Sequence, residues 1–129
     1  MRTARTTAPT YEEDRLRELY SLGLLDTYSD LRFDRYTRLA AGVFDTPIAL
    51  VSLVDANRQW FKSSCGLDAR ETARDISFCT HAIEEEWGLV IPDAQADPRF
   101  RDNPLVTGEP HIRFYAGGVL RGPGGFPLG

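Results

Sequence analysis

Cys79 and His81 are the two residues of this chain whose types most readily support chemistry. A thiol beside an imidazole can act as a nucleophile with its base, as part of a metal site, or as the anchor of a chromophore. The segment 78–86 is predicted to be a short helix with Ser77 as its N-cap. Residues at i and i+2 of a helix point to different faces, so the two side chains should not meet. We therefore expect Cys79 to pack as a buried small hydrophobe and His81 to lie at the core boundary.

Cys65 is the second cysteine, and it ends a predicted strand beside Gly66. Neither cysteine belongs to a CxxC pair and no Cys/His cluster accompanies them, so the sequence predicts no metal site. A small redox enzyme needs an attacking and a resolving thiol within reach of a disulfide. Cys65 and Cys79 could fill these roles only if their Cα atoms lay within about 7 Å of each other. The chain has no serine nucleophile elbow, glycine-rich phosphate loop or HExxH motif, and we expect no catalytic residues and no cofactor.

Three alternating residues, His111, Arg113 and Tyr115, should share one face of the strand predicted over 112–120. An arginine between two hydrogen-bonding side chains can clamp an anionic ligand, although an exposed polar face is the commoner arrangement. Asp93 follows another short strand, where it can accept a hydrogen bond from a ligand or cap the next turn.

Trp60 and Phe61 lie in a predicted strand over 59–65 and should point to its opposite faces. One of these rings should then face the pocket side of the sheet and offer a flat stacking wall. Packing in the core is the alternative for each of them.

The elements that must position these residues follow from hydrophobic periodicity and turn chemistry. A Thr10/Glu13 capping box opens a helical run over 12–25, and a second amphipathic run covers 30–46. Their apolar faces suit a helical dimer interface, although core packing is the default use of such faces. Because consecutive strands meet through hairpins, we predict an α+β fold with a largely antiparallel sheet and helices on one side. The remaining predicted elements are strands at 48–54, 59–65, 89–91 and 112–120, a polar loop at 67–75 and the short helix at 78–86.

The strand at 48–54 is apolar at nearly every position, which is typical of a central strand covered on both faces. Only the strand at 59–65 is a local partner for it. A glycine-rich turn at 122–125 is typical of a hairpin. The sequence, however, offers no recognisable return strand between this turn and Gly129. We therefore expect a fragment of marginal stability, because an unpaired central strand exposes backbone donors and acceptors.

Composition and charge argue against two classes of partner. The formal net charge is −4 and the basic residues are interspersed with acids, which argues against binding along a nucleic-acid backbone. No apolar run approaches the ~20 residues of a membrane-spanning helix. The basic stretch 1–10 lacks the apolar core of a secretory signal. We interpret it as a disordered leader before a domain over 11–129, and we expect a cytoplasmic protein.

Several segments, in order, resemble the GAF domains found at the N-termini of bacterial sensor histidine kinases and diguanylate cyclases. PIALVSLVD at 47–55, RDISFC at 74–79 and IRFYAG at 112–117 are the longest of them. The likeness covers residues 12–129, nearly the whole chain. The other segments are at 17–19, 24–27, 33–35, 58–63, 66–67, 81–83, 93–94, 97–100 and 103–106.

The resemblance implies a six-stranded antiparallel sheet between helices, with a small-molecule pocket on one face of the sheet. It also implies that the pattern continues past Gly129 with a last strand and a C-terminal helix, both missing here. We predict a non-enzymatic sensory domain of a bacterial signal-transduction protein, which binds an unknown small molecule, forms a homodimer through its N-terminal helices, or does both. The kinase or cyclic di-GMP output would lie in another domain. The ligand-binding candidates are Trp60, Phe78, Cys79, Asp93, Phe100, Arg113 and Tyr115.

Two alternatives to the sensory role stay open. Some GAF-fold proteins reduce free methionine sulfoxide with pocket cysteines, and Cys65 and Cys79 are the only thiols that this chain offers for such a reaction. An inactive fragment is the other alternative. Pigment binding is disfavoured, because bilin-binding GAF domains carry a cysteine followed by histidine, whereas Thr80 intervenes here.

Overall fold

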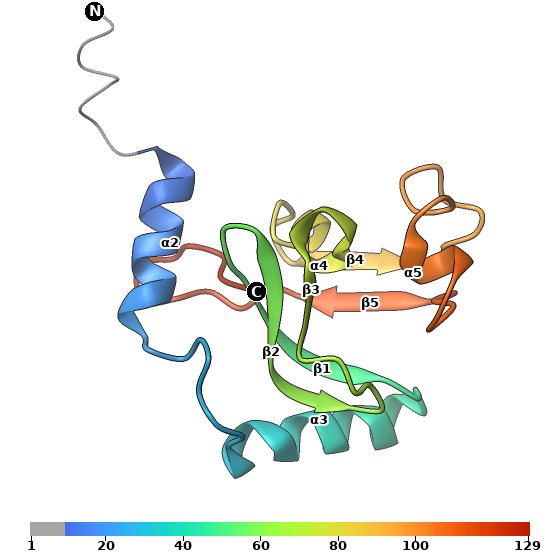
Figure 1. Cartoon of the computed structure of the whole chain (residues 1–129), viewed down its shortest axis with the longest axis horizontal. Coiled ribbons are helices and arrows are strands. Elements are labelled where there is room, and N and C mark those ends of the chain that lie inside the picture. The colour runs from blue at the N-terminus through green and yellow to red at the C-terminus, as the bar shows by residue number, and fades with distance from the viewer. Residues whose placement is uncertain (1–9) are drawn as a thin grey trace, which may run out of the picture.

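The computed structural model describes residues 10–129 (Figure 1), so the leader expected at 1–10 lies, apart from Thr10, outside the described residues. The fold is α+β with antiparallel strands, as predicted. The helices are α2 (Tyr11–Ser21), α3 (Leu31–Phe44), the 3-10 turn η1 (Arg74–Ile76), α4 (Phe78–Ala82) and α5 (Pro104–Thr107). The strands are β1 (Ala49–Val54), β2 (Arg58–Cys65), β3 (Glu71–Ala73), β4 (Gly88–Ile91) and β5 (Tyr115–Gly118).

The predicted capping box starts α2. The Thr10 hydroxyl accepts a hydrogen bond from the Glu13 amide at 3.1 Å, and the Glu13 carboxylate accepts one from the Thr10 amide at 2.7 Å. The helix ends at Ser21, earlier than predicted, because Gly23 adopts a left-handed conformation with φ of 63°. Asp30 caps α3 in the same way by accepting a hydrogen bond from the Arg32 amide at 2.9 Å.

The strands form two antiparallel sheets, β1-β2-β3 and β4-β5. The hairpin of β1 and β2 was predicted, and its register shifts at a bulge between Val51 and Ser52. The loop predicted at 67–75 contains β3, which pairs with the start of β2 through Thr72 and Gln59. Two of its three residues are polar and the third is Ala73, so hydrophobic periodicity gave no signal for a strand there.

A return segment follows the glycine-rich turn at 122–125 and pairs with the chain before the turn. The expectation that no return strand follows this turn was therefore wrong. Leu128 donates its amide hydrogen to the Leu120 carbonyl at 2.8 Å, and its own carbonyl accepts from the Val54 amide of β1 at 2.8 Å. The C-terminal segment, residues 126–129, thus pairs with the end of the last hairpin and with the free edge of β1. It connects the two sheets.

Helix α2 lies beside this C-terminal hairpin, as Figure 1 shows at the left of the molecule. The buried Arg15 guanidinium donates to the Pro127 carbonyl at 3.3 Å, and Gly124 donates its amide hydrogen to the Glu18 carboxylate at 2.9 Å. Leu19 of α2 and Leu128 of the C-terminal segment also pack in one core cluster with Leu53 and Trp60. The first helix and the last residues therefore share one core.

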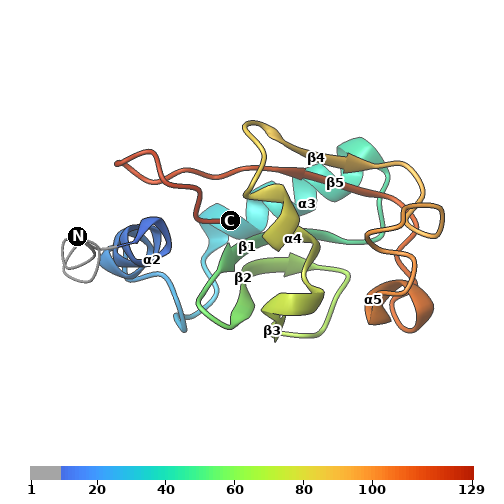
Figure 2. The same ribbon diagram turned by 90° about the horizontal axis from the view of Figure 1, so that it is seen from above.

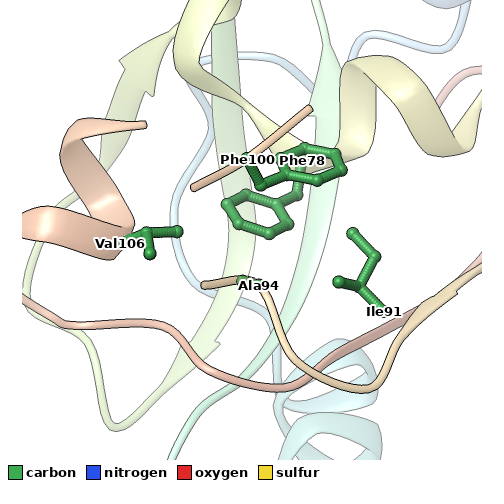
Figure 3. Packing of buried hydrophobic residues seen from close by; sticks show 5 residues of the cluster. All are labelled: Phe78, Ile91, Ala94, Phe100 and Val106. Atoms are coloured by element: carbon green, nitrogen blue, oxygen red, sulfur yellow. The ribbon is translucent and has the colours of Figure 1, made fainter. Parts of the chain in front are cut away.

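Helices α3 and α4 lie on opposite faces of the β1–β2 hairpin (Figures 1 and 2). A second core cluster, Phe78, Ile91, Ala94, Phe100 and Val106, lies on the α4 side (Figure 3). No helix among residues 10–129 has the length and apolar character needed to cross a membrane.

The orientation of α3 differs from what was expected. Because apolar helix faces usually pack in the core, the apolar face of this helix was expected to point inward, but much of it points outward. Its buried residue is Thr37, which shares a hydrogen bond of 2.9 Å with Ser63 of β2. The apolar set Phe33, Tyr36, Leu39, Ala40, Val43 and Phe44 lies to the side or outward, and four of its members are exposed. Ser63 of β2 also donates a hydrogen bond to the Asp34 carboxylate of α3 at 2.6 Å, so the polar face of α3 packs inward.

Candidate functional site

Four of the seven predicted ligand-binding residues come together on the α4 side of the molecule: Phe78, Cys79, Phe100 and Tyr115. Ser77 starts α4 by accepting a hydrogen bond from the Thr80 amide, and this cap places Phe78 and Cys79 in the first turn. Tyr115 begins β5, and Phe100 lies in the loop between β4 and α5.

The aromatic rings of this α4–β5 site pack closely. Phe78 and Phe100 lie ring to ring (Figure 3). They stack with centroids 4.3 Å apart and planes 16° from parallel. Tyr115 meets Phe78 at 5.1 Å. Phe100 has no exposed surface and Phe78 is 3% exposed. The rings therefore fill the place where a ligand pocket was expected, and a ligand would have to displace them.

The Cys79 sulfur lies between two hydroxyl groups. Ser52 of β1 donates a hydrogen bond to it at 3.1 Å, and the Tyr115 hydroxyl lies 3.3 Å away. Burial raises the pKa of the Cys79 thiol above its usual value, despite the opposing effect of these two hydrogen bonds. Burial and the neighbouring thiol likewise raise the pKa of Tyr115. At neutral pH the site is uncharged, and the thiol is a poor nucleophile.

His81 points to a different group, as its spacing from Cys79 predicted. Its ring meets the edge of Phe100 with centroids 4.8 Å apart and planes at 70°. Cys79 is half-buried as a residue, but its sulfur contacts Ser52 and Tyr115. No hydrogen bond joins the two side chains in the described part of the chain, so they do not form a nucleophile and its base.

The other three predicted residues lie elsewhere. Trp60 is 4% exposed in the cluster with Leu19 and Leu53, so it is a core residue on the other side of the sheet. Asp93 is exposed and caps a turn by accepting a hydrogen bond from the Gln95 amide at 3.0 Å. Arg113 is exposed and donates to the Val106 and Ile112 carbonyls at 2.9 and 3.1 Å.

The anion clamp predicted on the last strand is wrong in its geometry. The strand begins only at Tyr115, so Arg113 precedes it. His111 is exposed and takes a left-handed conformation with φ of 59°. The alternation that would align these side chains therefore does not exist at 111–114.

Ser52 is a site residue that was not predicted. It opposes Phe61 in the hairpin and is 6% exposed. It is the single polar residue in the apolar run 48–54. That interruption was a usable signal, since a buried hydroxyl requires a hydrogen-bonding partner.

Two hollows lie on the α3 side of the molecule. A polar one of about 400 Å³ lies between α3 and β2, with Asp34, Thr37 and Ser63 on its wall. An apolar one of about 350 Å³ is lined by Leu22, Leu24, Arg32, Phe33 and Tyr36. Among residues 10–129, no group of three or more His, Cys, Asp or Glu side chains is placed to hold a metal ion.

These features define a small α+β domain with an uncharged, ring-filled site beside α4. No family model matches the chain. The chain is similar to a cyclic di-GMP phosphodiesterase of Pseudomonas aeruginosa, with 48% identity over 125 residues. The match takes in 95% of this chain and 21% of that protein, so the chain spans about a fifth of the relative's length.

Proposed function

We propose that this chain is a GAF-type regulatory domain of a cyclic di-GMP signalling protein, and that the catalytic output lies in another domain. The observation that carries the proposal is the 48% identity to a cyclic di-GMP phosphodiesterase. The matching region makes up only 21% of that protein's length. A matching region of 125 residues has the size of one domain, and the remaining four fifths of the relative leave room for a separate catalytic domain.

The strand arrangement supports the GAF part of the proposal. The C-terminal segment pairs with β1 at Val54 and with Leu120, beyond the end of β5. It therefore brings the two small sheets toward one antiparallel sheet with β3 and β4 at its edges. Helices α3 and α4 then cover opposite faces, as the resemblance implies.

The cysteines favour a regulatory role over the redox alternative. Cys65 pairs with Ala49, whereas the Cys79 sulfur contacts Ser52, three residues further along β1. Three residues of a strand span about 10 Å, more than the reach of a disulfide. The raised pKa of Cys79 also keeps this thiol protonated. We infer that neither thiol is catalytic and that the domain is not itself an enzyme.

The proposal has two further parts: the small molecule that the domain binds and the second copy of the chain with which it associates. The rings of Phe78, Phe100 and Tyr115 favour an apolar or aromatic small molecule, which would enter the α4–β5 site by displacing the loop that carries Phe100. Association of two copies through the N-terminal helices is the route by which the domain would act on its output.

The proposal is tested in the Pseudomonas phosphodiesterase. One variant lacks the 125 residues that match this chain, and a second carries this chain in their place. We expect the deletion to change the rate of cyclic di-GMP hydrolysis by about 5-fold or more, a typical allosteric coupling, and the replacement to restore it. The isolated chain should hydrolyse no cyclic di-GMP.

Chromatography of the nucleotide products measures all three reactions. A deletion variant with the rate of the parent enzyme would contradict the regulatory role. Hydrolysis by the isolated chain would contradict the assignment of the output to another domain.

A further inference from the structure

The polar hollow between α3 and β2, the α3–β2 hollow, has the size of a small-molecule site and more cations than acids on its wall. Its volume of about 400 Å³ lies within the usual range for ligand pockets, about 300–1,000 Å³. The cations are Arg38 of α3, Lys62 of β2 and Arg70 of the loop before β3. The acids are Asp34 and Asp68. This excess of positive charge is local, because the whole chain has a formal net charge of −4.

Lys62 is a buried cation whose hydrogen-bonding partners are neutral. It is 7% exposed, and its ammonium group donates to the Thr27 hydroxyl and to the Tyr28 carbonyl at 2.7 Å each. The ring of Phe33, with its centroid 5.7 Å from the ammonium, adds a cation–π contact. Within residues 10–129, no carboxylate forms an ion pair with Lys62. An ammonium group has three donors, and buried charges are normally paired, so a negative group is its natural further partner.

The two arginines of the hollow are exposed, and their guanidinium groups form no hydrogen bond with the described part of the chain. Arg38 is carried by the helix. The backbone of Arg70 is held in place, because its carbonyl accepts a hydrogen bond from the Phe61 amide of β2 at 3.0 Å. Guanidinium groups bind carboxylates and phosphates through paired donors. The hollow therefore offers three cations from three separate segments.

The remaining polar groups of the wall already bond with one another. Ser63 donates to the Asp34 carboxylate at 2.6 Å and shares a hydrogen bond of 2.9 Å with Thr37. Ser64 donates to the Leu67 carbonyl at 2.7 Å. These bonds fix α3, β2 and the following loop, and they engage the nearer acid, Asp34. The cations are thus the groups left to bind a ligand.

We propose that the α3–β2 hollow binds a small oxyanion, a carboxylate- or phosphate-bearing molecule, through Lys62, Arg38 and Arg70. The hollow lies on the α3 side of the molecule, apart from the α4–β5 site where the proposed function places an apolar ligand. The proposal goes beyond that function and depends on no part of it.

Calorimetric titration of the full chain with citrate and with inorganic phosphate, at constant ionic strength, tests the proposal. We expect saturable binding of at least one of them, with a dissociation constant below about 1 mM. Citrate binding alone would assign a carboxylate ligand, and phosphate binding alone a phosphate ligand. Sodium chloride at the same ionic strength controls for screening of the surface charges. Saturation by neither anion would overturn the proposal.

Arg38→Gln is the informative variant, and Arg35→Gln is its matched control. Both arginines are exposed on α3 and both substitutions remove one positive charge, but only Arg38 lines the hollow. Arg38→Gln should raise the dissociation constant by about 10-fold or more, because a charge-assisted hydrogen bond is lost. Arg35→Gln should stay within about 2-fold of the wild type, because a distant exposed charge is screened. Equal weakening by both would indicate general charge attraction and would overturn the proposal.

Arg70→Gln is the second variant, because substitution of Lys62 would also remove its bonds to Thr27 and Tyr28. It should weaken binding as Arg38→Gln does, and far-ultraviolet circular dichroism shows whether each variant is folded. Unchanged affinity in both folded variants would place the anion elsewhere and overturn the proposal. None of these titrations bears on the deletion experiment with the phosphodiesterase, so the two proposals fail separately.

Discussion

At the scale of single residues, the Cys79 thiol joins three elements. Its backbone belongs to α4, its sulfur accepts from Ser52 of β1, and the Tyr115 hydroxyl of β5 lies 3.3 Å away. Burial raises the pKa of both Cys79 and Tyr115, so the contact exists between uncharged groups at neutral pH. Ionisation of either group would place a charge among the stacked rings.

This arrangement predicts a loss of stability in alkali. Unfolded cysteine ionises near its usual pKa of 9.0, below the raised pKa of folded Cys79. The stabilising contribution is therefore fully present below pH 9.0 and is lost as the pH rises through the folded pKa. We expect the free energy of unfolding, measured with urea from about pH 7 to 11, to fall above about pH 9.

Cys79→Ala should make that fall smaller, and Cys65→Ala serves as the matched control for removal of a thiol. If Cys79→Ala showed the same decline with pH as the wild type, the buried thiol would have no part in it.

At the scale of elements, two glycines near the α3–β1–β2 unit have opposite requirements. Gly42 lies in α3, and a methyl group added there would meet no atom within 4 Å. Gly66, just after β2, has φ of +83°, and an added methyl group would overlap the Pro47 carbonyl oxygen. The first position has room for a methyl group, whereas the second needs glycine because of both its backbone conformation and the close approach.

We expect Gly42→Ala to raise the free energy of unfolding by about 0.5–1 kcal/mol, since alanine is the better helix former. Gly66→Ala should lower it by about 1–3 kcal/mol, because a side chain at positive φ is strained and the backbone must also move. Chemical denaturation of the two variants measures both changes. A stabilised Gly66→Ala variant would mean that the end of β2 does not lie against Pro47.

At the scale of the whole molecule, the C-terminal segment connects parts that are distant in the sequence. Leu128 is 3% exposed and packs with Leu19, Leu53 and Trp60, while its carbonyl accepts from Val54. The first helix, the first strand and the last residues thus belong to one cooperative unit.

Leu128→Ala should therefore lower the free energy of unfolding by about 2–5 kcal/mol, the range for loss of a core leucine. Leu120→Ala is the matched control, because Leu120 lies in the same hairpin but is 49% exposed. Its effect should stay below about 1 kcal/mol. Thermal unfolding of the two variants measures the difference, and equal midpoints would place the C-terminal segment outside the core.

Local sequence signals predicted much of this fold. The Thr10/Glu13 box gave the start of α2, and the apolar run before Pro92 gave β4. The orientation of α3 was not predictable, because periodicity shows which residues share a face but not which face meets the sheet. The hydrogen bonds of Ser63 on β2 with Thr37 and Asp34 of α3 decide that question.

The candidate site was predicted in part for the same reason. Phe78 and Cys79 follow a clear N-cap, so their place at the start of α4 was visible in the sequence. Alternation along β2 placed Trp60 and Phe61 on opposite faces, but it did not tell which face carries the site, and Trp60 lies on the other one. The convergence of Phe100 and Tyr115 depends on tertiary packing between segments with no local signal.

The buried position of Gly129 has a practical consequence for labelling. A side chain at this position would overlap the Ser52 carbonyl oxygen, and the residue is buried against β1. A fluorescent reporter or affinity tag fused directly after it would begin in this crowded position beside Ser52 of β1. Thr10 is exposed, so a reporter fused ahead of α2 is the better choice for the unfolding measurements.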